Sequence, residues 1–161
     1  MDEPTCAYIA GFLDGDGCIL VQLKPRQGYR YGYQIKATVS FYQKRQGRHL
    51  LEWLQRQIGV GRIRDRKDGV SQYDIEGVAH VLRLLRAISP YLVAKRQQAQ
   101  KVIKLLEAMQ QNPKPSPEEF LRWAGLVESC QALNYSKKRR HTVEEVARFL
   151  SNKGVSHPRN D

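Results

Sequence analysis

Alternating apolar and polar positions predict two half-buried β-strands near the start of the chain. Ile19, Val21 and Leu23 take one face, and a longer alternation runs over residues 31–42. The other face of the first segment carries Leu20, Gln22, Lys24 and Arg26. A period of two places every second side chain on one face of a strand. Residues 25–28 contain proline and glycine, which predict a loop. We therefore expect an antiparallel hairpin with one face in the core and the other in water.

A second, shorter hairpin is predicted around a glycine turn. Arg62, Arg64 and Arg66 share one side of a strand that begins just after two glycines. The Asp-Gly pair at 68–69 is a strong signal for a tight turn, and residues 70–75 return as the second strand. The chain thus supplies four strands in two pairs.

Helical periodicity appears between and after the strands. Apolar residues recur there at intervals of three and four, as on the buried face of an amphipathic helix. The helices predicted in this way span residues 46–57, 78–88 and 94–109. A linker over 112–117 follows, and capping patterns that begin at Ser116 and Thr142, each with a glutamate three residues later, predict two more helices.

The N-terminal segment combines small residues at helical spacing with two carboxylates. Ala7, Gly11 and Gly15 recur every four residues, so on a helix they form one stripe without bulky side chains. Each glycine costs about 1 kcal/mol relative to alanine inside a helix. Close approach of a second helix along this stripe is the economical explanation. The segment ends with Asp14 and Asp16 among glycines, a pattern that on its own is typical of a turn.

The order of these elements predicts an α+β fold. A helix, two strands, a helix, two strands and a helix form an αββαββα pseudo-repeat, with one four-stranded antiparallel sheet and its helices packed on one face. The 161 residues suffice for one well-cored domain, which we place at residues 1–150. We expect residues 151–161 to be a flexible C-terminal tail.

Charge sets the acidic end of the first helix apart from the rest of the chain. The 27 lysine and arginine residues exceed the 16 aspartate and glutamate residues, for a formal net charge of +11. Such an excess favours a polyanionic partner such as nucleic acid. Acidic groups that face a polyanion are unfavourable unless a cation lies between them. The sequence therefore indicates a divalent metal at these carboxylates.

Residues 9–17 resemble the signature of the LAGLIDADG homing endonucleases. They read Ile-Ala-Gly-Phe-Leu-Asp-Gly-Asp-Gly, which matches the signature with conservative changes. The similarity extends to the order of elements that follows and covers most of the chain. It includes stretches near Gln43 and over residues 59–66, 90–98 and 132–140. A single copy of the signature implies a homodimer whose subunits meet along the stripe of small residues.

The resemblance also implies an activity and the residues that carry it. The chain would be a site-specific double-strand DNA endonuclease of intron homing that cleaves a long pseudo-palindromic site and leaves 3′ overhangs. Asp16 would bind Mg²⁺, or Mn²⁺ in its place, with the backbone carbonyl of Gly15, while Asp14 would be structural. Gln43 would organise water, and Lys95 would be a cation near the scissile phosphate. No small-molecule cofactor is implied.

One position departs from the family's pattern. Gly47 stands where an arginine commonly completes the basic pocket around the active site. Arg45 and Arg48 are the neighbouring candidates to replace that charge.

The free face of the sheet carries side chains suited to base edges. Lysine and arginine match the acceptors of guanine in the major groove, and glutamine matches adenine. An ordinary solvated sheet face has a similar composition, so this alternative stays open. The expected DNA-binding residues of the strands and adjoining loops are Gln22, Lys24, Arg26, Tyr29, Gln34, Lys36, Ser40, Tyr42, Arg62, Arg64, Arg66, Gln72 and Asp74.

A basic run at residues 137–140 precedes the last predicted helix. Such runs are typical of solvated turns, but the positive end of the following helix would favour a phosphate. In the resembling family this loop contacts the DNA backbone. Lys137 and Arg140 are therefore expected to add affinity rather than sequence choice.

Two other functions remain open from sequence. One is a non-cleaving DNA-binding regulator or an intron-RNA maturase on the same fold, which a plasmid-cleavage assay with and without divalent metal would separate. The other is a basic protein without sequence preference, whose binding would depend on salt but hardly on sequence.

Cysteine use and hydropathy indicate a soluble intracellular protein. Cys6, Cys18 and Cys130 are too few and too scattered for a disulfide framework. No run approaches the length of a membrane-spanning helix, and the first residues lack the features of a signal peptide. We expect an organellar or prokaryotic cytoplasmic location and no membrane partner.

Overall fold

Four strands form one antiparallel sheet in the order β1-β2-β4-β3. The computed structural model describes residues 1–134 and 141–154. The strands span Gly17–Pro25 (β1), Tyr33–Lys44 (β2), Arg62–Asp65 (β3) and Val70–Glu76 (β4). Strand β2 pairs with β1 on one side and with β4 on the other, so the two predicted hairpins join into a single sheet. The predicted α+β class is confirmed.

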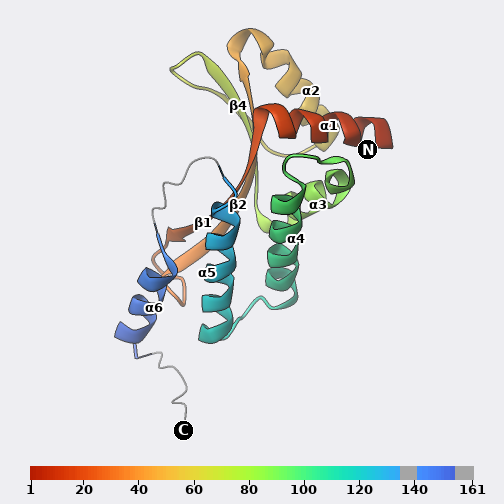
Figure 1. The fold of residues 1–161 in the computed structure, drawn as a ribbon. Coiled ribbons are helices and arrows are strands. Elements are labelled where there is room, and N and C mark those ends of the chain that lie inside the picture. The colour runs from red at the N-terminus through yellow and green to blue at the C-terminus, as the bar shows by residue number, and fades with distance from the viewer. Residues whose placement is uncertain (135–140, 155–161) are drawn as a thin grey trace.

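The described residues form six α-helices beside the sheet, and Figure 1 shows them packed on one side of it. They span Glu3–Asp16 (α1), Arg48–Ile58 (α2), Val78–Ile88 (α3), Arg96–Gln111 (α4), Pro117–Gln131 (α5) and Val143–Asn152 (α6). Two short 3₁₀ turns, η1 at Arg45–Gly47 and η2 at Ser89–Tyr91, lead into α2 and follow α3. The opposite face of the sheet carries no helix in the described part of the chain.

The core lies between the sheet and the helices. The alternating residues Ile19 and Val21 of β1 are buried, as are Ile9 and Leu13 of α1. Full burial of such a side chain contributes about 1.5–3 kcal/mol. This contact fixes α1 against the sheet, and therefore fixes the position of the acidic residues at the end of α1.

The ends of several elements differ from the sequence prediction. Strand β1 stops at Pro25 and β3 stops at Asp65, so Arg26 and Arg66 lie in the turns beyond them. Helix α2 begins at Arg48 rather than at 46, because η1 makes the first turn. Helix α6 continues to Asn152, past the predicted start of the tail at residue 151, and residues 155–161 lie outside the described residues.

The predicted helix caps are confirmed. The Ser116 hydroxyl accepts from the backbone N–H of Glu119 at 3.1 Å. Thr142 and Glu145 form a reciprocal capping box at the start of α6. Both caps satisfy N–H groups that the first turn of a helix leaves without partners.

Candidate active site and nucleic-acid interface

Asp16 is the last residue of α1 and lies at the surface, where the chain turns into β1. The turn requires Gly17, because a Cβ there would lie 2.8 Å from the backbone oxygen of Ser40 and 2.6 Å from Leu13 Cδ1. The Oδ2 of Asp16 accepts from Gln43 Nε2 at 2.9 Å. The structure therefore brings together Asp16 and Gln43, two of the three predicted catalytic residues.

Asp14 lies two residues before Asp16 on α1, and its side chain faces the start of α4. Its carboxylate accepts from the backbone N–H groups of Val93, Ala94 and Lys95 at 2.7, 3.1 and 2.9 Å. Burial raises the pKa of Asp14, but these three hydrogen bonds outweigh it and hold the pKa below its ordinary value. They also explain why α4 begins at Arg96 rather than at the predicted residue 94. This geometry supports a structural role for Asp14.

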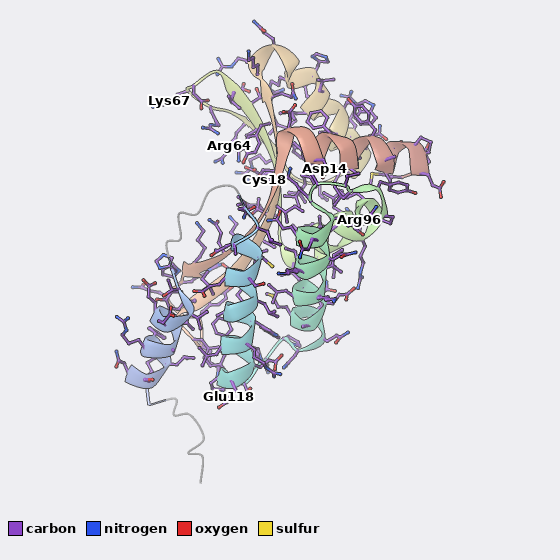
Figure 2. All side chains as sticks on the ribbon, in the orientation of Figure 1. Asp14, Cys18, Arg64, Lys67, Arg96 and Glu118 are labelled. Carbon is purple, nitrogen blue, oxygen red and sulfur yellow. The ribbon has the colours of Figure 1, made fainter. Side chains whose placement is uncertain are left out.

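Lys95, the third predicted catalytic residue, contacts the same end of α1. Its Nζ donates to the backbone oxygen of Asp14 at 2.8 Å. Carbonyls in the last turn of a helix lack intrahelical partners and carry partial negative charge, which a cation stabilises. The lysine ammonium is thus held at the backbone of Asp14, two residues before Asp16, at the C-terminal end of α1. Figure 2 marks this region by Asp14 and Cys18, on either side of the turn.

The oxygen donors at this helix end fit a hard divalent cation only in part. Such cations prefer carboxylate and carbonyl oxygens, which Asp16 and the exposed backbone of Gly15 offer. Within the described residues, no group of three or more histidine, cysteine, aspartate and glutamate side chains is placed to hold a metal. These side chains of the described residues therefore do not by themselves complete the coordination shell of such an ion.

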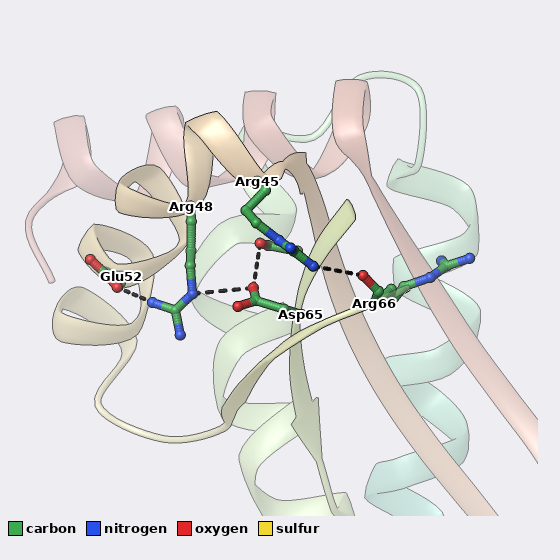
Figure 3. Close-up of polar contacts among 6 residues, drawn as sticks. Arg45, Arg48, Glu52, Asp65 and Arg66 are labelled. Atoms are coloured by element: carbon green, nitrogen blue, oxygen red, sulfur yellow. Dashed lines mark hydrogen bonds and ion pairs between the residues drawn. The ribbon is translucent and has the colours of Figure 1, made fainter. Parts of the chain in front are cut away.

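The two arginines considered as replacements at Gly47 are engaged elsewhere (Figure 3). Arg45 donates to the backbone oxygen of Arg66 at 2.9 Å, and Arg48 pairs with Asp65 at 3.2 Å and with Glu52. Both guanidinium groups therefore brace the β3–β4 hairpin, and neither contacts Asp16.

The free face of the sheet contains most of the expected DNA-binding residues. Lys36 pairs with Glu76 at 2.8 Å, and Arg26 donates to Gln34 Oε1 at 2.6 Å. The Arg26 guanidinium also lies 4.8 Å from the centre of the Tyr29 ring. The exposed or only partly buried members are Gln22, Lys24, Arg26, Tyr29, Gln34, Lys36, Tyr42, Arg62, Arg64, Arg66 and Asp74.

Ser40 and Gln72 correct the expectation that this whole face is open to solvent. They are 1% and 8% exposed, because both donate to the Asp74 carboxylate. Tyr42 is half-buried beside Cys18, with 3.4 Å between its hydroxyl and the sulfur. Burial raises the pKa of Tyr42 to about 12, so its phenol stays neutral at physiological pH.

The small-residue stripe of α1 is exposed in the single chain. Ala7, Gly11 and Gly15 all face solvent, and a Cβ built on either glycine meets no atom within 4 Å. Tyr8 beside the stripe is 51% exposed and packs edge-on against Trp53. Nothing in the described residues covers this face of the helix.

Comparison with known proteins establishes the family. The family model described as LAGLIDADG endonuclease matches residues 9–111, more than half of the chain. The chain belongs to the LAGLIDADG endonuclease family. The DNA endonuclease I-CreI of Chlamydomonas reinhardtii is 40% identical over 143 residues, which cover 89% of this chain and 86% of that protein. The DNA endonuclease I-CvuI of Chlorella vulgaris is 31% identical over 153 residues, 95% and 94% of the two chains.

Solved structures of homing endonucleases agree with this fold. The crystal structure of I-CvuI in complex with its target, in the presence of 2 mM Ca, superposes with a TM-score of 0.89 at 29% identity, over 96% of this chain and 97% of that one. The archaeal homing endonuclease I-Vdi141I complexed with DNA has a TM-score of 0.83 at 16% identity, over 97% and 100%, which is a likeness of fold alone.

The LAGLIDADG endonuclease match contains Asp16, Gln43 and Lys95, and thus every predicted catalytic residue. The predicted phosphate contacts Lys137 and Arg140 lie outside the described residues. Sequence reasoning missed the interactions that Asp74 makes with its neighbours, because they depend on strand register. None of the helices in residues 1–134 and 141–154 has the length and hydropathy needed to cross a bilayer.

Proposed function

We propose that this protein is a homing endonuclease that cuts both strands of a specific DNA site as a homodimer. The observation that carries the proposal is the placement of Asp16. It lies exposed at the end of α1, next to the uncovered small-residue stripe, and contacts Gln43 near the end of β2. Two copies that meet along Ala7, Gly11 and Gly15 would bring two Asp16 carboxylates close to one duplex.

The free sheet face is the proposed DNA-reading surface. Its residues include exposed arginines on the β3–β4 hairpin and half-exposed glutamine and lysine side chains on β1 and β2. These are donors and acceptors of the kind that distinguish base pairs in the major groove. The comparison with I-CvuI supports this, since that protein was crystallised in complex with its target. Lys137 and Arg140 are proposed to contact the backbone beyond this surface.

The residues around Asp16 would divide the work of phosphodiester hydrolysis. Asp16 and the Gly15 carbonyl would hold Mg²⁺, or Mn²⁺ in its place, with the phosphate and the second copy supplying further oxygens. Such an ion, when bound, favours formation of a hydroxide nucleophile and stabilises the leaving oxygen. Gln43 orients the Asp16 carboxylate through its 2.9 Å hydrogen bond. Lys95 places a positive charge at the same helix end, where it would attract the scissile phosphate.

The Asp16→Asn variant tests this proposal. An amide keeps the shape of the side chain but loses the charge that binds a divalent cation, so cleavage in Mg²⁺ should fall by at least about a hundredfold. Binding to the target should change little, because Asp16 is not among the proposed base contacts. The readouts are plasmid linearisation and gel-shift affinity on a target selected from a randomised duplex library.

Asp2→Asn is the matched control, because Asp2 lies at the opposite end of the same helix. Its carboxylate caps α1 by accepting from the Thr5 N–H at 2.9 Å, and asparagine caps a helix equally well. This variant should cleave normally. Full cleavage by Asp16→Asn would remove the proposed role of Asp16, and specific binding without cleavage by the wild-type protein would favour a DNA-binding regulator.

A further inference from the structure

Asp74 on β4 is surrounded by hydrogen-bond donors on the free face of the sheet. Its Oδ1 accepts from the Ser40 hydroxyl at 2.5 Å and from Gln72 Nε2 at 2.7 Å. Its Oδ2 lies 3.4 Å from a guanidinium nitrogen of Arg64. The Asp74 side chain is only 13% exposed, whereas that of Arg64 is 61% exposed. A recessed carboxylate thus lies beneath an exposed cation.

Strand register brings these side chains together. Ser40 of β2 lies directly opposite Asp74, and Gln72 is two positions away on the same face of β4. Arg64 of β3 lies opposite Gln72, so it is the diagonal neighbour of Asp74. Long side chains reach such diagonal positions. Figure 2 shows Arg64 on the β3–β4 hairpin, away from the helices that cover the other face.

The chemistry of a carboxylate fixes how these neighbours are oriented. A carboxylate only accepts hydrogen bonds, so Ser40 must direct its proton to Asp74 and Gln72 must turn its amide nitrogen toward it. Both side chains are thereby held within the sheet. Arg64 has five N–H donors, of which the pairing with Asp74 engages one nitrogen. The remaining donors of this guanidinium stay available to a ligand.

We propose that Asp74 is a positioning residue that sets the base preference of Arg64. The inference rests on the proposed function, in which this face of the sheet lies against the major groove. A guanidinium held at one end by a carboxylate is preorganised to present its other N–H groups to O6 and N7 of guanine. The same pairing keeps Arg64 away from phosphates, where it would add affinity without sequence choice.

Asp74 also acts on the overall affinity for DNA, which it lowers. Its negative charge faces a polyanion and weakens the attraction to DNA of any sequence. Removal of the charge should therefore tighten binding to unrelated duplex while it reduces the preference for the correct base. A residue that only stabilised the sheet would, when lost, weaken both kinds of binding together.

The test compares single and double variants on a duplex that the wild-type protein selects from a randomised library. Arg64→Ala first identifies the base pair that Arg64 reads, as the position where the preference for guanine disappears. At that pair, Asp74→Asn should reduce the preference about tenfold, while binding to unrelated duplex becomes tighter. The double variant should show no further loss there, because both residues act on one contact.

Glu76→Gln is the matched control. Glu76 lies two residues further along the same face of β4, is 53% exposed and pairs with Lys36 at 2.8 Å. Its substitution makes the same change in charge, so it should also tighten binding to unrelated duplex. The preference at the base pair read by Arg64 should not change.

The Asp74→Glu variant separates the effect of geometry from the effect of charge. It is also the variant to measure if Asp74→Asn fails to fold. It keeps the negative charge but moves the carboxylate by one methylene, so the base preference should fall without tighter binding to unrelated duplex. If both Asp74 variants keep the base preference at the pair read by Arg64, this inference is wrong, while the proposed function still holds. If the wild-type protein selects no sequence, the proposed function fails, and this inference fails with it.

Discussion

Asp14 and Asp16 are two residues apart, yet their side chains have different surroundings. Asp14 is turned toward three backbone N–H groups at the start of α4, whereas Asp16 is exposed and contacts Gln43. The first arrangement ties the end of α1 to Lys95, and the second leaves a carboxylate accessible. Asp14 therefore fixes the end of α1 in place, and Asp16 remains the accessible carboxylate of the same segment.

At the scale of single residues, we predict that Asp14→Asn destabilises the fold by about 2 kcal/mol at pH 7. Both oxygens of Asp14 accept from backbone N–H groups, whereas the NH2 group of asparagine cannot accept. The folded-state pKa of Asp14 lies below its unfolded value, so the carboxylate contributes stability above about pH 4. That contribution is lost as the pH falls through the folded pKa. Urea unfolding at a series of pH values should show the wild-type and variant curves converge in acid.

Asp16→Asn is the control for this measurement, because it changes an exposed carboxylate at the same helix end. Its effect on the free energy of unfolding should stay within about 0.5 kcal/mol. A stability difference for Asp14→Asn that is equally large at pH 7 and well below pH 4 would contradict the role of these hydrogen bonds.

At the scale of elements, α1 combines a buried face with an exposed stripe. Ile9 and Leu13 fix the helix to the sheet, while Gly11 and Gly15 leave its opposite side uncovered. A Cβ added at Gly11 would meet no atom of its own chain within 4 Å, and leucine has a higher helix propensity than glycine. A bulky side chain there would instead separate two helices that meet closely.

We therefore predict that Gly11→Leu folds normally but no longer forms a dimer. Sedimentation velocity measures the assembly, and circular dichroism reports the fold. Gly125→Leu on α5 is the matched control, since a Cβ at this helical glycine also meets nothing within 4 Å. The control should leave the dimer intact. An unchanged dimer in Gly11→Leu would show that the stripe is not the contact between subunits.

Local sequence patterns predicted the elements better than their ends. Both hairpins and the caps at Ser116 and Thr142 depend on residues close in sequence, and the structure confirms them. Helix α4 begins two residues after the predicted position, because its start depends on Asp14, about 80 residues away. Likewise the pairing of Ser40 with Asp74 depends on the register between β2 and β4, which no local pattern contains.

At the scale of the whole molecule, one chain provides half of the proposed homodimeric endonuclease. Each chain contributes one exposed Asp16 at the end of one uncovered helix stripe, and the described residues contain no larger acidic cluster for a metal. The formal net charge of +11 favours attraction to DNA. In the proposed function, cleavage of two strands requires two copies, with one Asp16 for each strand.

A mixed dimer tests this division of work most directly. One wild-type subunit and one Asp16→Asn subunit, purified through two different tags, would be incubated with Mg²⁺ and a supercoiled plasmid that carries one target site. We predict that the mixed dimer only nicks the plasmid, whereas the wild-type dimer linearises it and the doubly substituted dimer does neither. Linear product from the mixed dimer, at the rate of the wild-type dimer, would contradict the account.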